Sequence, residues 1–340
     1  MNKYKALLGV AMLLAPAFAM AQANISNGNI RIGVRADGAL MPNLESGTTG
    51  ITYLATGNDA LTPGCLCEAW GIADAISATS GYTGADVGTV GITNLSFVST
   101  ATTATSVVDA LGKFEVTHSF SPSAATLGLY EVRVTIKNTS AASTRVLYGR
   151  AMDWDVGPTE FAELVTMQRG NSANLIYSSD DGFFTADPLA NDVPDLFFNQ
   201  NVVDSGPADH GAHFRFDFGN LAPGASVEFT IGYGAENSTA AALASLTAFG
   251  AESYSLGEPS SSTDGTPNTF MFAFKGTGGT PIIGGTCAGQ GYKGAKLTWC
   301  KNICENGLTG QVLDTWIHRW ITRYRVLPYC AVEGGGDTPT

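Results

Sequence analysis

Residues 145–167 read RVLYGRAMDWDVGPTEFAELVTM, and this stretch decides the fold. Side chains alternate between the two faces of a β-strand, so Asp153 and Asp155 share one face of the strand predicted here. The chain then turns at Gly157-Pro158. The opposite face of the strand is apolar and carries Val146, Tyr148, Met152 and Trp154. One backbone joins a core-facing surface to a pair of carboxylates, so both the core and a functional site are expected here.

Alternation of apolar and polar residues recurs along the chain and predicts a mainly β protein. Residues 213–218 (HFRFDF) and 227–233 (VEFTIGY) are expected to pair as a hairpin, because Pro-Gly in the connection NLAPG suits a type II turn. Strands at 113–120 and 130–137 are expected to form an antiparallel meander that leads into the Asp153 strand. Other strands are expected at 29–35, 51–54 and 269–275. This pattern favours an antiparallel β-sandwich or an enlarged sandwich.

Two segments lack such runs and are expected to be irregular. Residues 62–91 are rich in glycine, and a loop of this length in a compact domain is usually functional or cross-linked. Residues 204–213 (DSGPADHGAH) read as a loop because glycine and proline interrupt them. A short helix is expected to start after Ser238, which can cap it, and to run to about Phe249, with Gly250 as its end.

The charge distribution separates an acidic body from a basic C-terminal part. The 340-residue chain has a net charge of −12, with 44% hydrophobic and 14% charged residues. Residues 22–275 carry a charge of −16, whereas residues 286–330 carry +4. Nucleic-acid binding needs clustered Lys and Arg, so the acidic body argues against nucleic acid as a partner. The basic part is suited to docking on the acidic body of another copy, which allows self-association.

The N-terminus is typical of an exported protein. Residues 1–21 join two lysines to an apolar run and end in Ala-Met-Ala, which predicts a secretory signal peptide cleaved before Gln22. The apolar run is shorter than the roughly 20 residues that a membrane-spanning helix needs, and no later segment is long and apolar enough. We therefore expect a secreted protein, extracellular or on the outer cell surface, with no transmembrane segment.

The six cysteines predict disulfides in an exported chain. Cys65 and Cys67 are separated by one residue, so they either close a tight ring or each bond elsewhere. The other four are Cys287, Cys300, Cys304 and Cys330, for which three pairings are open. They predict a disulfide-stapled module of two helices at residues 287–330, because a unit this small cannot build a large core.

The predicted organisation therefore has five parts. The signal peptide occupies residues 1–21, and the β-sandwich body occupies residues 22–275. A Gly-rich linker at 276–286 leads into the four-cysteine module, whose helices are expected at 296–306 and 310–324. Residues 331–340 are expected to be a disordered tail.

Asp153 and Asp155 are the candidate metal ligands. Their i, i+2 spacing lets both carboxylates approach one cation, and Ca²⁺ suits oxygen ligands in an exported protein. Glu160, Asp180 and Asp181 are available as further ligands, although they match no recognised calcium-loop spacing. The alternative is a solvated strand end, or carboxylates that accept hydrogen bonds from the adjoining turn. No other cofactor is predicted.

Two further groups are candidates for ligand binding. Asp209, His210 and His213 are residue types that bind zinc, but they match no zincin motif, and a loop that hydrogen-bonds its own backbone is the alternative. Glu68 and Trp70 are suited to holding a sugar, because aromatic faces stack on sugar rings and carboxylates accept hydrogen bonds from hydroxyls. Core packing of Trp70 is the alternative there.

No catalytic residue is assigned from the sequence. A Gly-x-Ser-x-Gly elbow, a Walker loop and a dinucleotide fingerprint with its strand and helix are all absent. Two catalytic carboxylates would need a set separation that a sequence does not give.

Several segments resemble a family of exported Gram-negative proteins without an assigned reaction, many of which end in a PEP-CTERM sorting signal. The segments are CLCEAWGIADA (65–75), SGYTGADVG (80–88), LYEVRVTIKNTS (129–140), LYGRAMDWDVGPTEF (147–161), DSGPADHGAHFRFDFGNLAPG (204–224) and TPNTFMFAFKG (266–276). The run DWDV-x-PT-x-F is the most specific of them. The resemblance implies surface or extracellular placement. The chain departs from that family at its end, where the four-cysteine module replaces the sorting signal.

These observations favour a non-enzymatic exported protein with a structural, matrix or binding role. The alternative is a module that binds or acts on extracellular carbohydrate with calcium as its cofactor. Its partner would then be an extracellular glycan or a cell-surface component.

Overall fold

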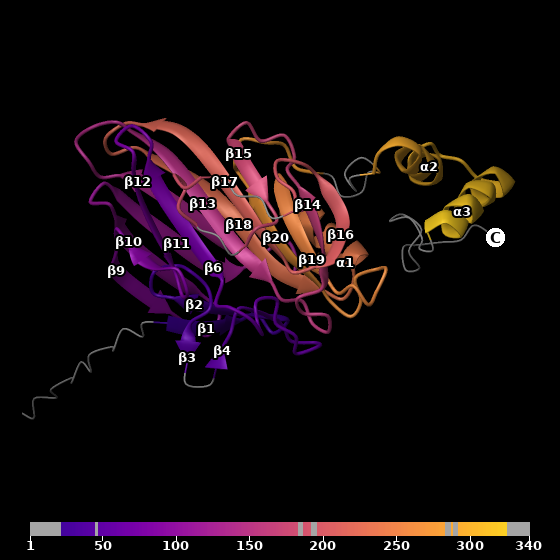
Figure 1. Ribbon diagram of the computed structural model, residues 1–340, viewed down its shortest axis with the longest axis horizontal. Helices are drawn as coiled ribbons and strands as arrows, with labels where there is room; N and C mark the ends of the chain where they lie inside the picture. Colours follow the sequence, from indigo (N-terminus) through magenta and orange to yellow (C-terminus); the bar gives the residue numbers. More distant parts are fainter. Residues whose placement is uncertain are drawn as a thin grey trace, which may run out of the picture.

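The fold is a sandwich of two antiparallel sheets that enclose one main core, so the mainly β prediction is confirmed (Figure 1). The computed structural model describes residues 22–44, 47–182, 186–191, 196–282, 287 and 292–324. The predicted signal peptide, part of the predicted linker, Cys330 and the predicted tail lie outside the described residues.

The larger sheet has nine strands. In spatial order they are β16 (Val202–Ala208), β14 (Glu163–Gln168), β19 (Ser253–Glu258), β20 (Thr269–Lys275), β18 (Ser226–Glu236), β12 (Leu129–Asn138), β11 (Phe114–Pro122), β10 (Ala104–Ala110) and β9 (Ile92–Ser99). Every second side chain of its central strands points into the core, as Phe229, Ile231 and Tyr233 of β18 do. The predicted strand at 269–275 is confirmed by β20.

The smaller of the two facing sheets contains the stretch that decides the fold. Its strands are β15 (Leu175–Ser179), β17 (His210–Leu221), β13 (Thr144–Trp154), β6 (Glu68–Asp74), β7 (Thr79–Gly84) and β8 (Gly88–Val90). The predicted apolar face of β13 is confirmed, because Val146, Tyr148, Met152 and Trp154 are fully buried. The Trp154 indole Nε1 donates a hydrogen bond to Ser255 Oγ at 3.1 Å, which links the two sheets. β13 lies between β17 and β6 and is buried on both faces.

Two small sheets formed by the N-terminal segment lie at one end of the sandwich (Figure 1). One contains β1 (Gln22–Ser26), β2 (Ile30–Arg35) and β5 (Ile51–Tyr53), and the other pairs β3 (Asn43–Leu44) with β4 (Gly47–Thr48). The segment after β2 is tied to the core because Trp70 Nε1 donates a hydrogen bond to Asp37 O at 2.9 Å. The predicted strands at 29–35 and 51–54 are confirmed.

The predicted hairpin of residues 213–218 and 227–233 is wrong. The first segment lies in β17 of the six-stranded sheet, and the second lies in β18 of the nine-stranded sheet. Their aromatic rings meet across the core instead, with the ring centroids of Phe218 and Phe229 4.9 Å apart. The predicted meander fails in the same way, since β11 and β12 pair but β13 crosses to the other sheet. Alternation shows which face of a strand is buried, and it does not show whether the next strand lies beside or opposite it.

The expected irregular segments are also corrected. Residues 62–91 contain β6, β7 and β8, and residues 204–213 belong largely to β16 and β17. Glycine in β6 has a packing role, because Gly71 pairs with Gly149 of β13 and a Cβ on Gly71 would lie 2.1 Å from Ala186 O. The missing side chain lets another segment of backbone lie directly on the sheet.

The helix predicted after Ser238 is confirmed as α1 (Thr239–Phe249). Ser238 Oγ accepts a hydrogen bond from Ala241 N, and Gly250 ends the helix in a left-handed conformation with φ of 81°. Leu246 and Phe249 belong to a second apolar cluster that also contains Met271 of β20. This helix therefore covers the outer face of the nine-stranded sheet.

The C-terminal part forms α2 (Gly294–Cys304) and α3 (Gly310–Tyr324), close to the two predicted helices. They share a small core around Cys300, Ile303 and Trp320. Cys287 and Cys300 form a disulfide, and Cys304 is also disulfide-bonded. Among the described residues, no helix is both long and apolar enough to cross a membrane.

A fully buried ion pair connects the two sheets to the N-terminal segment. Arg150 Nε of β13 donates to Glu68 Oε1 of β6 at 2.5 Å. Glu68 also accepts hydrogen bonds from Leu40 N at 2.7 Å and from the Tyr233 hydroxyl of β18 at 3.3 Å. Arg150 Nη2 donates to Gly38 O at 3.1 Å. Each charge is compensated by the other and by hydrogen bonds, which buried charges require.

We expect Glu68→Gln to lower the free energy of unfolding by about 3–5 kcal/mol, because the buried Arg150 charge would lose its counter-ion. The matched control is Glu228→Gln, which removes the same charge from an exposed pair with Arg133 at 3.7 Å. The control should cost less than about 1 kcal/mol. Urea unfolding followed by fluorescence measures both values, and equal losses would contradict a structural role for the buried pair.

Candidate metal centre

Three carboxylates meet at the end of the β13–β17 strand pair. Asp153 is in β13, Asp155 directly follows this strand, and Asp209 directly precedes β17. The last pair in the register is Trp154 with His210, so the antiparallel chains bring Asp155 and Asp209 next to each other. Side-chain oxygens of the three residues lie within 4.8 Å of one another. The pair predicted from the sequence therefore gains a third carboxylate from a distant segment.

Two carboxylates of this cluster, Asp153 and Asp155, are buried and have side-chain oxygens without a hydrogen-bond partner among the described residues. Asp155 is fully buried, and neither of its side-chain oxygens has a hydrogen-bond partner among the described residues. Asp153 is 2% exposed, and its Oδ1 also has no hydrogen-bond partner among the described residues. Neighbouring Glu163 of β14 accepts a hydrogen bond from His210 N at 2.6 Å through Oε1, while its Oε2 has no such partner. Buried polar atoms normally have partners, so these oxygens need an explanation.

Burial and mutual repulsion raise the pKa values of Asp153, Asp155 and Glu163 and thereby favour their neutral forms. Burial, followed by the charges of Asp155, Asp209 and Glu163, raises the pKa of Asp153 to about 9. Burial also raises the pKa of Asp155 to about 7, with contributions from Asp209 and Glu160, and raises the pKa of Glu163 to about 8. A cation among the carboxylates would reverse these shifts, since a nearby positive charge favours the ionised form.

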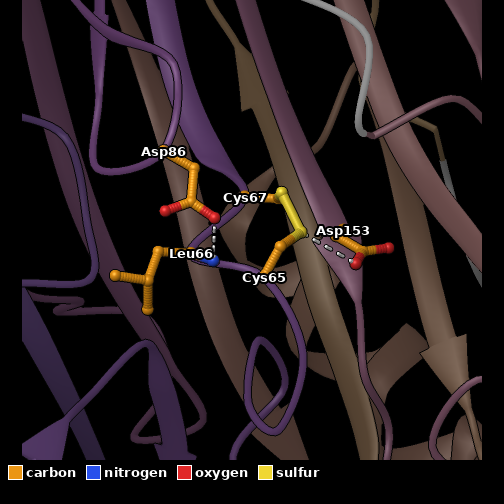
Figure 2. Close-up of a disulfide and its surroundings, with 5 residues drawn as sticks. All are labelled: Cys65, Leu66, Cys67, Asp86 and Asp153. Atoms are coloured by element: carbon orange, nitrogen blue, oxygen red, sulfur yellow. Dashed lines mark hydrogen bonds between the residues drawn. A yellow bond between two sulfur atoms is a disulfide. The ribbon is translucent and has the colours of Figure 1, made fainter.

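The Gly64–Cys67 segment lies beside the cluster, and Figure 2 shows its two cysteines next to Asp153. Cys65 and Cys67 form a disulfide with each other, which settles the alternative left open by the sequence. Cys65 Sγ lies 3.5 Å from Asp153 Oδ2, and Asp153 N donates a hydrogen bond to Cys67 O at 2.9 Å. Gly64 packs directly on Asp155, because a Cβ at Gly64 would lie 2.5 Å from Asp155 Oδ2. The backbone and the disulfide therefore form a wall beside the carboxylates.

The donor set fits a hard divalent cation such as Ca²⁺. All three clustered side chains offer carboxylate oxygens, which Ca²⁺ binds at about 2.3–2.6 Å, so two of its ligands can lie up to about 5 Å apart. The nearest sulfur atoms belong to a disulfide and are not thiolates. Asp209 is exposed, so water can complete the coordination from that side. The cluster has the composition of a calcium site, and the candidate ligands are Asp153, Asp155 and Asp209.

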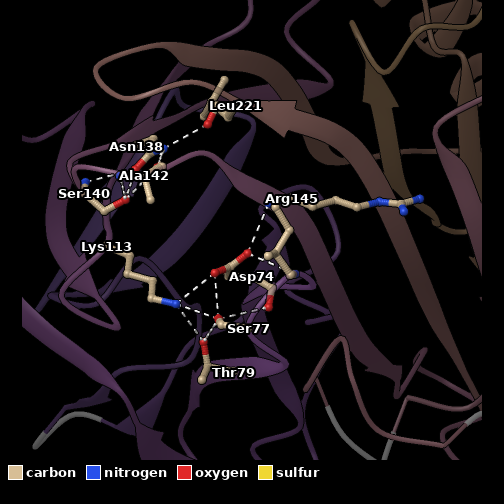
Figure 3. Close-up of polar contacts among 10 residues, drawn as sticks. Asp74, Ser77, Thr79, Lys113, Asn138, Ser140, Ala142, Arg145 and Leu221 are labelled. Carbon is tan, nitrogen blue, oxygen red and sulfur yellow. Dashed lines mark hydrogen bonds and ion pairs between the residues drawn. The ribbon is translucent and has the colours of Figure 1, made fainter.

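Asp74 provides a comparison, because it is a buried carboxylate that accepts several hydrogen bonds (Figure 3). Asp74, at the end of β6, accepts hydrogen bonds from Lys113 Nζ at 2.8 Å, Ser77 Oγ at 2.6 Å and Arg145 N at 3.1 Å. Burial acts to raise its pKa, but these hydrogen bonds outweigh burial and lower the pKa to about 2. Asp155 lacks such donors, and the backbone hydrogen bond from Trp154 to Asp153 does not offset the burial of that carboxylate, which distinguishes the cluster from an ordinary structural carboxylate.

The predicted group of Asp209, His210 and His213 does not converge. His210 and His213 lie on opposite faces of β17, since they are three positions apart in a strand. His210 Nδ1 is 3.1 Å from Asp180 Oδ2. The His213 ring packs edge-on against the Tyr177 ring, with the two ring centroids 5.5 Å apart. Only Asp209 joins the carboxylate cluster. The zinc hypothesis for these three residues is therefore not supported by their placement.

The sugar-binding hypothesis for Glu68 and Trp70 is corrected by their burial. Both side chains are fully buried, and Glu68 is occupied by Arg150. The Trp70 ring is stacked against Tyr148, with the centroids 5.9 Å apart. A sugar could not reach either residue, and the core-packing alternative for Trp70 holds.

The sequence did not indicate Glu163, Gly64 or the joining of Asp209 to the aspartate pair. Asp209 lies 54 positions after Asp155, and strand pairing alone brings them together. Glu163 comes from the opposite sheet. The charge of Glu160, one of the further candidate ligands, raises the pKa of Asp155. Asp180, another of them, accepts hydrogen bonds from Leu196 N and Phe197 N.

Comparisons with known proteins add little about this site. No protein-family model matches the chain, and no curated protein is significantly similar to it. A galactose mutarotase-like protein from Lactobacillus casei is 11% identical, with 74% of this chain and 87% of that chain covered and a TM-score of 0.34. A galactose mutarotase related enzyme from Lactobacillus acidophilus is 9% identical, with 74% and 85% covered and a TM-score of 0.29. At this level the likeness carries no argument about activity or site residues.

The raised pKa values predict that the cation-free protein loses stability as the pH rises. Unfolded carboxyl groups titrate near pH 4, so between about pH 4 and 9 the unfolded state releases protons that the folded state keeps. We expect Asp153→Asn to flatten this decrease, because an amide does not ionise. Urea unfolding in a chelator at pH 5 and pH 8 measures it.

The control for this pH dependence is Asp217→Asn, which removes a carboxylate that accepts a hydrogen bond from Arg145. The Asp217 pKa is lowered, so its titration lies below this pH range. The control should keep the wild-type decrease. An equally steep decrease in Asp153→Asn would show that Asp153 is already ionised at neutral pH.

Proposed function

We propose that this chain is an exported, non-enzymatic β-sandwich protein that binds Ca²⁺ and has a structural or binding role outside the cytoplasm. The observation that carries the proposal is the fully buried Asp155. Neither of its side-chain oxygens has a hydrogen-bond donor among the described residues, and one of them lies within 4.8 Å of oxygens of Asp153 and Asp209. A divalent cation supplies the positive charge that this arrangement lacks. The predicted signal peptide and the disulfides support an extracytoplasmic site of action.

A bound cation would join segments that are distant in the sequence. Asp153 and Asp155 continue from β13, Asp209 leads into β17, and the Gly64–Cys67 wall precedes β6. Ca²⁺ would hold the ends of these strands together at the rim of the sandwich. Extracellular calcium modules commonly bind with dissociation constants of about 10⁻⁴–10⁻³ M, which suits a structural ion outside the cell.

The carbohydrate alternative is weaker than the structural proposal. Its aromatic platform would have been Trp70, which is buried, so only the calcium part of that hypothesis keeps support. Export, placement on the cell surface, relationship to the PEP-CTERM-bearing family and self-association stay predictions. Fractionation of cells that produce the full-length chain, with N-terminal sequencing of the exported form, tests the export part.

We expect the wild-type protein to bind Ca²⁺ and Asp155→Asn to weaken this binding at least about 10-fold, because the site would lose a buried ligand. Isothermal titration calorimetry at pH 7.5 measures the affinity, and repeating it in buffers of different ionisation enthalpy counts the protons released. Asp217→Asn is the matched control, since it removes an aspartate from the same strand pair without touching the cluster. Its affinity should equal that of the wild type.

Saturating Ca²⁺ should also raise the melting temperature of the wild type, because a ligand that binds only the folded state stabilises it. The increase should be larger at pH 8 than at pH 5, where protons compete for the carboxylates. Absence of both calorimetric heat and a thermal shift at millimolar Ca²⁺ would refute the proposed calcium site.

A further inference from the structure

We infer that the Cys65–Cys67 disulfide controls the affinity of the proposed calcium site, so that cation binding and the redox state of this disulfide are coupled. The inference rests on the proposed function, because it concerns the regulation of the same site. The disulfide would be a positioning element: it touches the ligand Asp153 and does not itself bind the cation.

The disulfide segment contacts two of the three candidate ligands. Cys65 Sγ lies 3.5 Å from Asp153 Oδ2, and Cys67 O accepts the hydrogen bond from Asp153 N at 2.9 Å (Figure 2). Gly64, one residue before the disulfide, packs on the Asp155 carboxylate without room for a side chain. A movement of this segment therefore changes the surroundings of both carboxylates.

A small number of other interactions also hold the segment in place. Leu66 O accepts a hydrogen bond from Glu68 N at 3.1 Å, and the Leu66 side chain packs against the main core. Leu66 N donates a hydrogen bond to Asp86 Oδ2 at 2.9 Å, and Asp86 is exposed. Cys65, Leu66 and Cys67 are only half-buried, and Pro63 and Gly64 are exposed. Partial burial anchors Leu66, whereas the covalent bond between the two sulfurs directly restrains Cys65, the residue whose Sγ lies beside Asp153. The same exposure makes the disulfide accessible to a reductant.

Reduction would release this restraint through ordinary thiol–disulfide exchange. One thiolate of a dithiol reductant attacks a sulfur of the Cys65–Cys67 bond, forms a mixed disulfide and releases the other cysteine as a thiol. The second thiol of the reductant then attacks the mixed disulfide and releases the remaining cysteine. Two electrons and two protons pass to the protein, which gains two thiols, while the reductant closes its own disulfide. The freed segment must be reordered when the cation binds, and this entropy cost lowers the affinity.

Linkage requires the effect to run in both directions. If opening the disulfide weakens Ca²⁺ binding by a given factor, saturating Ca²⁺ must favour the closed disulfide by the same factor. Interactions that support metal ligands from outside the coordination shell commonly change affinity by about 10–100-fold, so a change of at least about 10-fold is expected in each direction.

The first test compares calcium affinities by calorimetry. Cys65→Ser/Cys67→Ser should bind Ca²⁺ at least about 10-fold more weakly than the wild type. The matched control is Cys287→Ser/Cys300→Ser, which removes the disulfide of the C-terminal helices and leaves residues 64–67 unchanged. It should keep the wild-type affinity. Circular dichroism confirms that both variants are folded.

The second test uses the unaltered protein and does not depend on a variant. The wild type is equilibrated in mixtures of reduced and oxidised dithiothreitol, with Ca²⁺ or with a chelator, and the alkylated Cys65–Cys67 peptide is quantified by mass spectrometry. Calcium should raise the ratio of closed to open disulfide at least about 10-fold. The peptide that contains Cys300 should show no such change.

The outcomes separate this inference from the proposed function. Equal calcium affinities of the wild type and Cys65→Ser/Cys67→Ser would overturn the coupling and leave the calcium site intact. A ratio of closed to open disulfide that does not change with calcium would do the same. Failure of the oxidised wild type to bind Ca²⁺ would overturn the calcium site itself.

Discussion

Burial of β13 on both faces is the constraint on which the rest of the structure depends. Its inner face packs Tyr148, Met152 and Trp154 into the core between the sheets. Its outer face is covered as well, so the aspartates at its end have little water to hydrate their charge. Partners for these charges must then come from other segments or from a ligand. The same strand that organises the core therefore also leads to buried carboxylate oxygens that lack hydrogen-bond donors among the described residues.

Three buried acidic sites of the described residues are stabilised in different ways. Glu68 is paired with Arg150 in the core, and Asp74 is surrounded by hydrogen-bond donors near the β6–β7 turn. Asp153 and Asp155 have neither arrangement and instead lie beside Asp209. The first two arrangements are complete without any ligand, and they hold strands together. The third is complete only with a proton or a cation, which is why the proposed function is placed there.

The residue pattern of this chain predicts which side chains are buried and does not predict which strands pair. Alternation identified β20 and the inner face of β13 correctly, because burial of every second residue follows from strand geometry. Alternation did not show that the strands of Phe216 and Phe229 lie in different sheets. A strand buries one apolar face whether its neighbour in the sequence lies beside it or in the facing sheet. Glycine misled in β6, where Gly71 serves close backbone contact and not a turn.

The sequence by itself determined the local features of this protein: the shared face of Asp153 and Asp155, the cap of α1 at Ser238, and the bounds of α3. Each depends on residues within a few positions, where backbone geometry fixes the relation. Only the tertiary structure decided that Asp209 completes the aspartate pair and that Glu68 meets Arg150, 82 positions away. Such contacts depend on which strands become neighbours, and that choice is made by the packing of the whole core.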